Sequence, residues 1–141
     1  MEGFQGAILR VKLRHLERWT QTRRAIVKTY NDRLAGADVV RPSETPWARH
    51  VYHLYTLRAD NRDSLQAALL NAGIQTGIHY STPVHLQPAY TALGYGPGSF
   101  PESEKAALEV LSLPLYPELS DSQIEDVAKA VMQATAVHKT A

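Results

Sequence analysis

The first 35 residues place apolar side chains at helical spacing. Apolar positions recur three and four apart from Phe4, and a second periodic stretch runs from Ile26 to Gly36, a glycine typical of helix C-termini. No proline interrupts residues 1–35, so we predict one long helix, or two nearly collinear helices that bend near Trp19. The apolar face is too wide to be buried by the roughly 100 residues that follow, so part of it should pack on a second chain or a missing domain. The alternative is an ordinary long core helix.

The middle of the chain has the pattern of a β-α-β unit. Residues 51–58 alternate between two sets of side chains rich in aromatic and β-branched types, which predicts a strand. A short amphipathic helix follows, capped by Asp60 or Asn61 and ended by Gly73. A second strand should begin at Ile74. Right-handed connection would make the two strands parallel, either adjacent or separated by a third.

The last third adds one apolar run and two helix starts. Val110, Leu111 and Leu113 make a brief apolar segment that Pro114 and Pro117 end, which predicts a third strand inserted between the other two. Ser99 with Glu102, and Ser120 with Gln123, have the spacing of helix capping boxes. The second of these should open the last helix.

These elements together predict an α/β (α+β) fold in two parts. Residues 1–36 should form a long connecting helix that contacts another domain or a second subunit. Residues 37–141 should form a small domain with a three-stranded sheet and helices. Because the chain starts almost inside its first helix, we interpret Met1 as the product of a truncation.

Composition narrows the functional classes. The chain has 141 residues, 44% of them apolar, which is enough for one domain with a core. Its net charge is +1, yet residues 1–35 carry eight basic against three acidic side chains, which favours docking on an acidic surface and is too weak for nucleic-acid binding. The absence of cysteine excludes disulfides and thiolate sites. No apolar run approaches the ~20 residues of a membrane span and no signal peptide is present, so we expect a cytoplasmic protein.

Polar chemistry concentrates in residues 77–90. Within this stretch lie two imidazoles, two phenols and a carboxamide, including His79, Tyr80, His85 and Gln87, punctuated by two prolines. A strand that ends in such a stiff, hydrogen-bonding loop suits the binding of a ligand. The alternative is a loop whose polar side chains only satisfy backbone groups.

Familiar catalytic arrangements do not fit the sequence. His50 and His53 point to opposite faces of a strand, and no carboxylate lies near His79 or His85 in sequence, so we expect no metal site. Nucleophile-elbow, P-loop and dinucleotide motifs are missing. No lysine has the apolar surroundings that a Schiff base requires, so we expect a binding domain and no catalytic residue. The lysines are Lys12, Lys28, Lys105, Lys129 and Lys139.

Four ordered segments resemble the C-terminal part of the DegT/StrS sugar aminotransferases. They are residues 1–9, 50–55, 77–90 and 111–119, and the likeness extends from residue 1 to about 133. The resemblance implies a pyridoxal-phosphate enzyme of the aspartate-aminotransferase fold (fold type I), usually a homodimer. Such an enzyme moves an amino group from glutamate to a nucleotide-linked keto sugar, and the loop resembles those of enzymes that aminate carbon three. This chain would supply the small C-terminal domain and its leading helix.

The resemblance also implies what this chain lacks and what it retains. In the family the Schiff-base lysine and the groups that hold the cofactor ring belong to the N-terminal domain, so we expect no cofactor-binding residue here, no bound pyridoxal phosphate and no activity of the chain alone. The positions that would border the sugar-nucleotide pocket are His53, His79, Tyr80, His85 and Gln87. The alternative function is a free-standing small-ligand or protein-interaction module that kept this fold.

Overall fold

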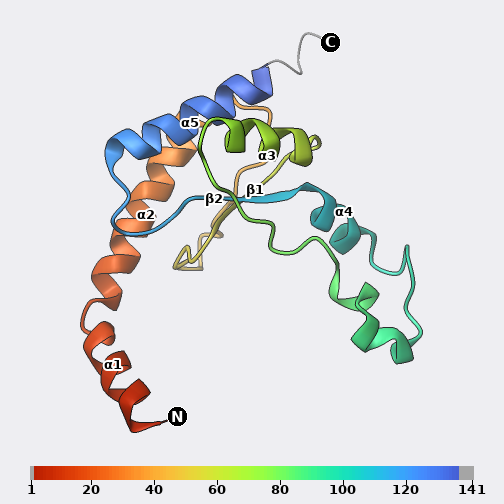
Figure 1. Ribbon diagram of the computed structural model, residues 1–141, viewed down its shortest axis with the longest axis horizontal. Helices are drawn as coiled ribbons and strands as arrows, with labels where there is room; N and C mark the ends of the chain where they lie inside the picture. Colours follow the sequence, from red (N-terminus) through yellow and green to blue (C-terminus); the bar gives the residue numbers. More distant parts are fainter. Residues whose placement is uncertain (1, 137–141) are drawn as a thin grey trace.

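The computed structural model describes residues 2–136, which form an arch (Figure 1). The sheet with α3 and α5 forms the top, α1 and α2 form one leg, and α4 leads into an arm that forms the other leg. The elements in chain order are α1 (Gly3–Leu13), α2 (Leu16–Arg33), β1 (Tyr55–Arg58), α3 (Arg62–Asn71), η1 (Val84–Leu86), η2 (Pro88–Leu93), α4 (Pro101–Glu109), β2 (Val110–Leu113) and α5 (Asp121–Ala136).

The predicted N-terminal helix is two consecutive helices. The N–H groups of Arg14 and His15 bond to carbonyls three residues earlier, at 3.2 and 3.0 Å, and α2 starts at Leu16. Such tight bonds close the last turn of α1, so the break lies at Arg14 and His15 and not at Trp19. The chain also leaves α2 before Gly36, because the helix ends at Arg33.

The two helices of this leg differ in how much they bury. No described residue of α1 is buried, and its Phe4 and Leu13 are 75% and 65% exposed. The second half of α2 instead inserts Ile26, Val27 and Tyr30 into the core, where all three are buried. An ordinary core helix therefore describes α2 alone. The apolar face of α1 is uncovered within residues 2–136, as the sequence pattern predicted.

The sheet has two strands and not the three that the sequence predicted. β1 and β2 pair antiparallel, with Tyr55 opposite Leu113 and Arg58 opposite Val110. The segment after α3 contributes only an isolated antiparallel bridge between Gly77 and Ser112. β2 thus lies between β1 and this segment, which runs in the direction of β1, as the predicted topology requires. The predicted third strand does not form, because the chain bends at His79, two residues after the bridge between Gly77 and Ser112.

The predicted strand at 51–58 is shorter than expected, since β1 begins only at Tyr55. Tyr52 takes a φ of 46°, in the left-handed region, and its N–H donates to Nδ1 of His50 at 2.8 Å. A side chain that binds nearby backbone competes with sheet pairing. The stretch from 50 to 53 is therefore irregular, with a bend at His53, and His53 lies outside the sheet.

The core fills the space between the sheet and the helices at the top of the arch (Figure 1). Tyr30 and Tyr55 are fully buried, and each phenol has a partner: Tyr30 donates to the Pro114 carbonyl at 2.9 Å, and Tyr55 donates to the Asn31 carboxamide oxygen at 2.8 Å. Burial raises the pKa of Tyr55 to about 12. Both rings therefore add apolar burial without leaving an unsatisfied hydroxyl.

Two of the predicted helix ends are confirmed in atomic detail. Gly73 has a φ of 77°, and the N–H of Ile74 donates to the Leu69 carbonyl at 2.9 Å, which completes a Schellman motif. Ser120 and Gln123 form the reciprocal capping box, with distances of 2.9 and 3.3 Å. Local sequence signals therefore suffice for these two ends.

The capping box predicted for Ser99 and Glu102 is wrong. α4 begins at Pro101, and the Ser99 hydroxyl accepts from the Gly96 N–H at 3.1 Å within the preceding turn. Proline at the first helical position has no N–H, so one fewer backbone donor at the start of the helix needs a capping acceptor. Glu104, one turn into the helix, binds the turn instead.

We expect Leu69→Ala to lower the free energy of unfolding by about 2–5 kcal/mol, because a fully buried leucine leaves a cavity between α3 and the sheet. Urea denaturation followed by circular dichroism measures the loss. The matched control is the next residue, Leu70, which is 61% exposed. Leu70→Ala should change the free energy by less than about 0.5 kcal/mol, and an equal loss in both variants would contradict the burial described above.

Candidate functional site

A cavity of about 570 Å³ lies between α4 and the arm formed by residues 79–100. We call it the loop cavity. Its wall is mostly apolar, with few polar atoms, which is the character of small-molecule sites. Six of its side chains carry aromatic rings: His79, Tyr80, His85, Tyr90, Tyr95 and Phe100. Other hollows, such as one of about 840 Å³ beside α5, have no comparable gathering of rings.

His79 is held at the rim of the loop cavity by a hydroxyl pair. Its Nδ1 lies 3.0 Å from Oγ of Ser112, and that oxygen lies 2.8 Å from Oγ1 of Thr56. Ser112 is on β2 and Thr56 faces it on β1, so the sheet register sets both hydroxyls. The ring itself is exposed and packs edge-on against Tyr80, with centroids 5.5 Å apart. An imidazole so placed can meet a ligand.

His85 has a different environment. Its side chain is 8% exposed, its Nε2 lies 3.0 Å from Oε1 of Glu104, and its ring packs edge-on against Phe100 at 4.8 Å. No carboxylate lies near this histidine in sequence, but the fold brings Glu104 to it from α4. His85 thus joins η1 to α4, and its Nε2 is already engaged.

Glu104 organises the turn that closes the loop cavity. Its carboxylate accepts from the Gly98 N–H at 2.9 Å and from the Phe100 N–H at 3.3 Å, besides His85. Hydrogen bonds lower the pKa of Glu104 below its usual value; the largest effect comes from the Gly98 N–H, followed by those of His85 and the Phe100 N–H. Partial burial acts in the opposite direction, because it disfavours the charged carboxylate. Phe100 in turn contacts Tyr95 edge-on at 5.0 Å. One carboxylate therefore fixes the aromatic wall.

The remaining predicted site residues lie elsewhere. Gln87 lines a separate shallow hollow of about 400 Å³, which shares Tyr80 and Thr82 with the loop cavity. His53 is exposed at the bend before β1 and lines neither hollow. The structure thus brings together His79, Tyr80 and His85 and leaves Gln87 at the edge.

Sequence reasoning missed the residues that support this site. Ser112 stands between two leucines in an apolar run, and it is 4% exposed in the structure. A single hydroxyl in a predicted core strand needs a hydrogen-bond partner, and this requirement could have indicated a role for Ser112 from the sequence. Nothing in the sequence indicated the role of Glu104, because its hydrogen-bond partners depend on how residues 94–100 fold back toward α4.

The described residues offer neither a metal site nor a membrane span. Between residues 2 and 136 no three histidine, cysteine or acidic side chains gather in an arrangement that could hold a metal ion. Over the same residues, no helix has the length and apolar character needed to cross a membrane.

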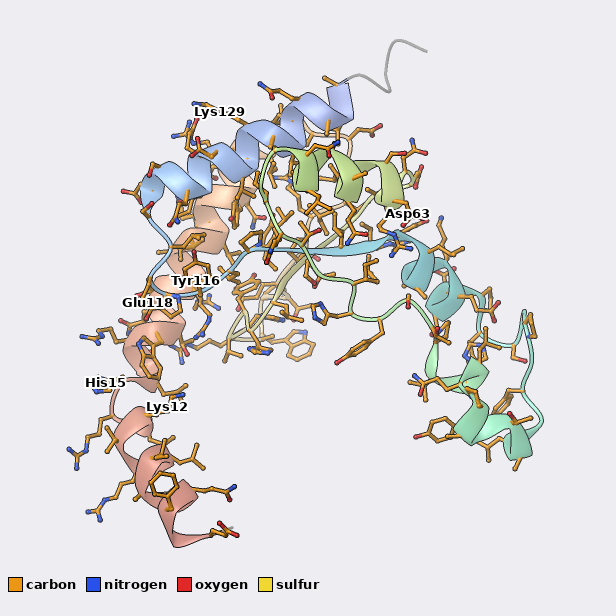
Figure 2. The ribbon with its side chains drawn as sticks, viewed as in Figure 1. Lys12, His15, Asp63, Tyr116, Glu118 and Lys129 are labelled. Carbon is orange, nitrogen blue, oxygen red and sulfur yellow. The ribbon has the colours of Figure 1, made fainter. Side chains whose placement is uncertain are left out.

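The lysines do not fit covalent attachment of pyridoxal phosphate. The side chains of Lys28, Lys105 and Lys129 are 80%, 60% and 63% exposed, and each faces an acidic residue one helical turn away. Lys129 lies on the outer side of α5 and Lys12 near the junction of α1 and α2 (Figure 2). A Schiff-base amine requires a desolvated setting, which these four positions lack. Lys139 lies outside the described residues.

A family model shows where these features belong. The model of the DegT/DnrJ/EryC1/StrS aminotransferase family matches residues 1–132. The chain belongs to this family. The prediction that it corresponds to the C-terminal domain of these sugar aminotransferases is confirmed.

Characterised sequences of the DegT/DnrJ/EryC1/StrS family are similar along nearly the whole chain. The erythromycin biosynthesis sensory transduction protein EryC1 of Saccharopolyspora erythraea is 49% identical over 90% of this chain and 35% of its own length. A pleiotropic regulatory protein of Geobacillus stearothermophilus is 46% identical over 94% of this chain and 37% of its own length. The chain therefore spans about a third of the length of the relatives it matches.

Solved structures of this family confirm the fold class. Streptomyces venezuelae DesV, in complex with a ketimine intermediate, superposes with a TM-score of 0.88 at 41% identity, over 92% of this chain and 35% of DesV. A DegT DnrJ EryC1 StrS aminotransferase from Brucella abortus gives 0.86 at 34% identity, over 93% and 35%. The mixed helix and strand domain of these aminotransferases is the fold of this chain, with the two-stranded sheet as its one correction.

We expect the Glu104 contacts to make stability depend on pH. A carboxyl whose pKa is lower in the folded than in the unfolded state stabilises the fold above its ordinary pKa of 4.5, and this contribution is lost as the pH falls below that value. Glu104→Gln should therefore reduce the difference between urea midpoints measured at about pH 7 and about pH 3.

The matched control is Glu102→Gln, in the exposed first turn of the same helix. Glu102 receives none of the turn's N–H groups that bind Glu104, so its replacement should preserve the pH dependence of the midpoint. Equal effects of the two substitutions would contradict the role assigned to Glu104.

Proposed function

We propose that this chain is the substrate-side C-terminal domain of a pyridoxal-phosphate aminotransferase that aminates a nucleotide-linked keto sugar, with glutamate as the amino donor. The observation that carries the proposal is the fixed His79 ring at the rim of a ring-lined cavity. The proposal includes a homodimeric, cytoplasmic enzyme whose lysine-bearing domain is supplied outside residues 1–141. The chain alone is then inactive.

The loop cavity has the chemistry that a sugar nucleotide needs. Imidazole and phenol groups at His79 and Tyr80 can bond to hydroxyl or phosphate oxygens. The apolar faces of Tyr90, Tyr95 and Phe100 can pack against a sugar ring or a base. The contribution of these residues is to bind and orient the substrate, which lowers the entropic part of the barrier. Pyridoxal phosphate supplies the electron sink for amino transfer when it is bound to the complete enzyme.

Relatives favour a substrate that reacts at carbon three. A Streptomyces venezuelae relative, 40% identical over 94% of this chain and 35% of its own length, is a dTDP-3-amino-3,4,6-trideoxy-alpha-D-glucose transaminase. One from Acidithiobacillus ferrooxidans, 32% identical, is a UDP-N-acetyl-3-dehydro-alpha-D-glucosamine 3-aminotransferase. Their nucleotides differ, but both names place the nitrogen on carbon three. We therefore infer amination at carbon three by the complete enzyme.

A second candidate function is a free-standing ligand or interaction module. Such a module would use the same apolar loop cavity with its polar groups at His79 and Tyr80. The two candidates differ in whether the ligand is changed. A module would bind sugar nucleotides without any contribution from a lysine-bearing domain.

The first test is the absorbance of the purified chain with pyridoxal phosphate. We expect no aldimine band and no covalent label after borohydride, because the four described lysines are exposed and engaged with water or acidic groups. A borohydride-trapped adduct on one lysine in equimolar amount would overturn the proposal that the amine comes from another domain.

The second test transplants the domain. In the Streptomyces venezuelae relative, this chain replaces the segment it matches, and amination of the relative's own keto sugar is followed. We expect activity, and His79→Ala should lower kcat/KM by about tenfold or more, because a bond to the substrate is lost. Ser122→Ala, on the exposed side of α5, serves as the control. A folded chimera that binds cofactor but never transfers nitrogen would favour the module.

A further inference from the structure

We propose that Ser112, Thr56 and Gly77 act together as positioning residues that fix the His79 ring, leaving its protonated Nε2 as the atom that meets the ligand. The positioning itself follows from contacts within this chain. Only the identity of the ligand, a sugar nucleotide, rests on the proposed function.

The first contribution comes from the hydroxyl pair. Ser112 is 4% exposed, so water cannot replace its partners, and its oxygen lies within bonding distance of both Nδ1 of His79 and Oγ1 of Thr56. The backbones are fixed as well: Ser112 exchanges two hydrogen bonds with Gly77, at 3.0 and 2.7 Å, and pairs with Thr56 in the sheet. A buried hydroxyl on a paired strand is a rigid anchor for a side chain at the surface.

The second contribution is the missing side chain at position 77. A Cβ added to Gly77 would lie 2.6 Å from Cε1 of His79, and 3.3 and 3.4 Å from its two ring nitrogens. The imidazole therefore lies directly over the Gly77 backbone. The φ of Gly77 is not in the left-handed region, so what matters here is the close approach of the ring and not the backbone conformation of the glycine. A side chain at position 77 would move the His79 ring from this place.

The direction of the hydrogen bonds follows from counting protons. If Thr56 donates to Ser112 and Ser112 donates to Nδ1, every hydroxyl proton has an acceptor. In the opposite direction the Thr56 proton needs a further acceptor, and none is found within residues 2–136. Each arrangement leaves one donor without a partner in the described part of the chain: Nε2–H of His79 in the first, and the Thr56 hydroxyl in the second. The His79 ring is exposed and Thr56 is half-buried, so the first arrangement places its remaining donor where a ligand can accept from it. This arrangement makes Nδ1 an acceptor and places the ring proton on Nε2.

The remaining nitrogen then serves the loop cavity. Nε2 of His79 has no hydrogen-bond partner in the described part of the chain, and the ring lines the cavity. A fixed N–H at the rim suits an acceptor oxygen, such as a phosphate or hydroxyl oxygen of the substrate. His85 contrasts with this arrangement, since its Nε2 already binds Glu104.

The positioning is tested by nitrogen NMR of the histidine-labelled chain at neutral pH, without ligand. We expect one His79 tautomer, with the proton on Nε2. Thr56→Val removes only the outer hydroxyl and should preserve this tautomer, as should the control Thr56→Ser. Ser112→Ala should convert the signal into a mixture of tautomers, while the spectrum of the core residues stays unchanged.

Two results would overturn the positioning. One is a His79 signal that is identical in wild-type and Ser112→Ala protein. The other is a wild-type proton on Nδ1 that moves to Nε2 in Thr56→Val, which would mean that the hydroxyl pair runs in the opposite direction. Both measurements are independent of any activity, so they do not depend on the proposed function.

The role of Nε2 is tested in the chimera with the Streptomyces venezuelae relative. A glutamine at position 79 would place its side-chain amide near the position of Nε2 of the histidine. An asparagine there would place its amide near the position of Nδ1. We expect His79→Asn to raise KM for the keto sugar about tenfold more than His79→Gln does, with kcat less affected. Equal KM values for His, Gln and Asn, with the NMR result intact, would refute the substrate contact and leave the positioning standing.

Discussion

The pair of hydrogen bonds between Gly77 and Ser112 is the constraint on which the site depends. It ties the segment that follows α3 to the free side of β2, although the two never form a full ladder. Beyond this single bridge the chain is released from the sheet and can cross to α4 as an irregular arm (Figure 1). The polar loop is thus fixed to the sheet at one rigid point. The conformation of the rest of the loop depends on side-chain contacts. Binding loops on rigid scaffolds are commonly built in this way.

The arm itself is stabilised by polar contacts more than by apolar burial. No described residue of η1 or η2 is buried, and the arm adds nothing to the main core. Glu104 supplies what the core does not, since three donors from different parts of the arm converge on one carboxylate. Segments with few apolar contacts are the least stable parts of a fold, so a ligand that fills the loop cavity would order the arm further.

Local signals in the sequence predicted most helices, the Schellman end at Gly73 and the capping box at Ser120 correctly, because each depends on residues within one turn. The order of the sheet was also predictable. The third strand was not, since the pairing of residues 74–79 with β2 depends on residues far away in sequence, such as Ser112, which is 33 residues from His79. For the site, residue type correctly suggested the loop 77–90. It could not separate His79 from His85, because the distinction depends on Glu104, which only the tertiary fold brings near.

The bare apolar face of α1 has a consequence for how this domain gains its order. α1 is eleven residues long and buries no side chain, and helices shorter than about 12–15 residues are marginal by themselves in water. Covering Phe4 and Leu13 with an apolar surface would therefore stabilise the helical state of α1 as well as bury those side chains. Folding of this helix and association with such a surface would then be one coupled event.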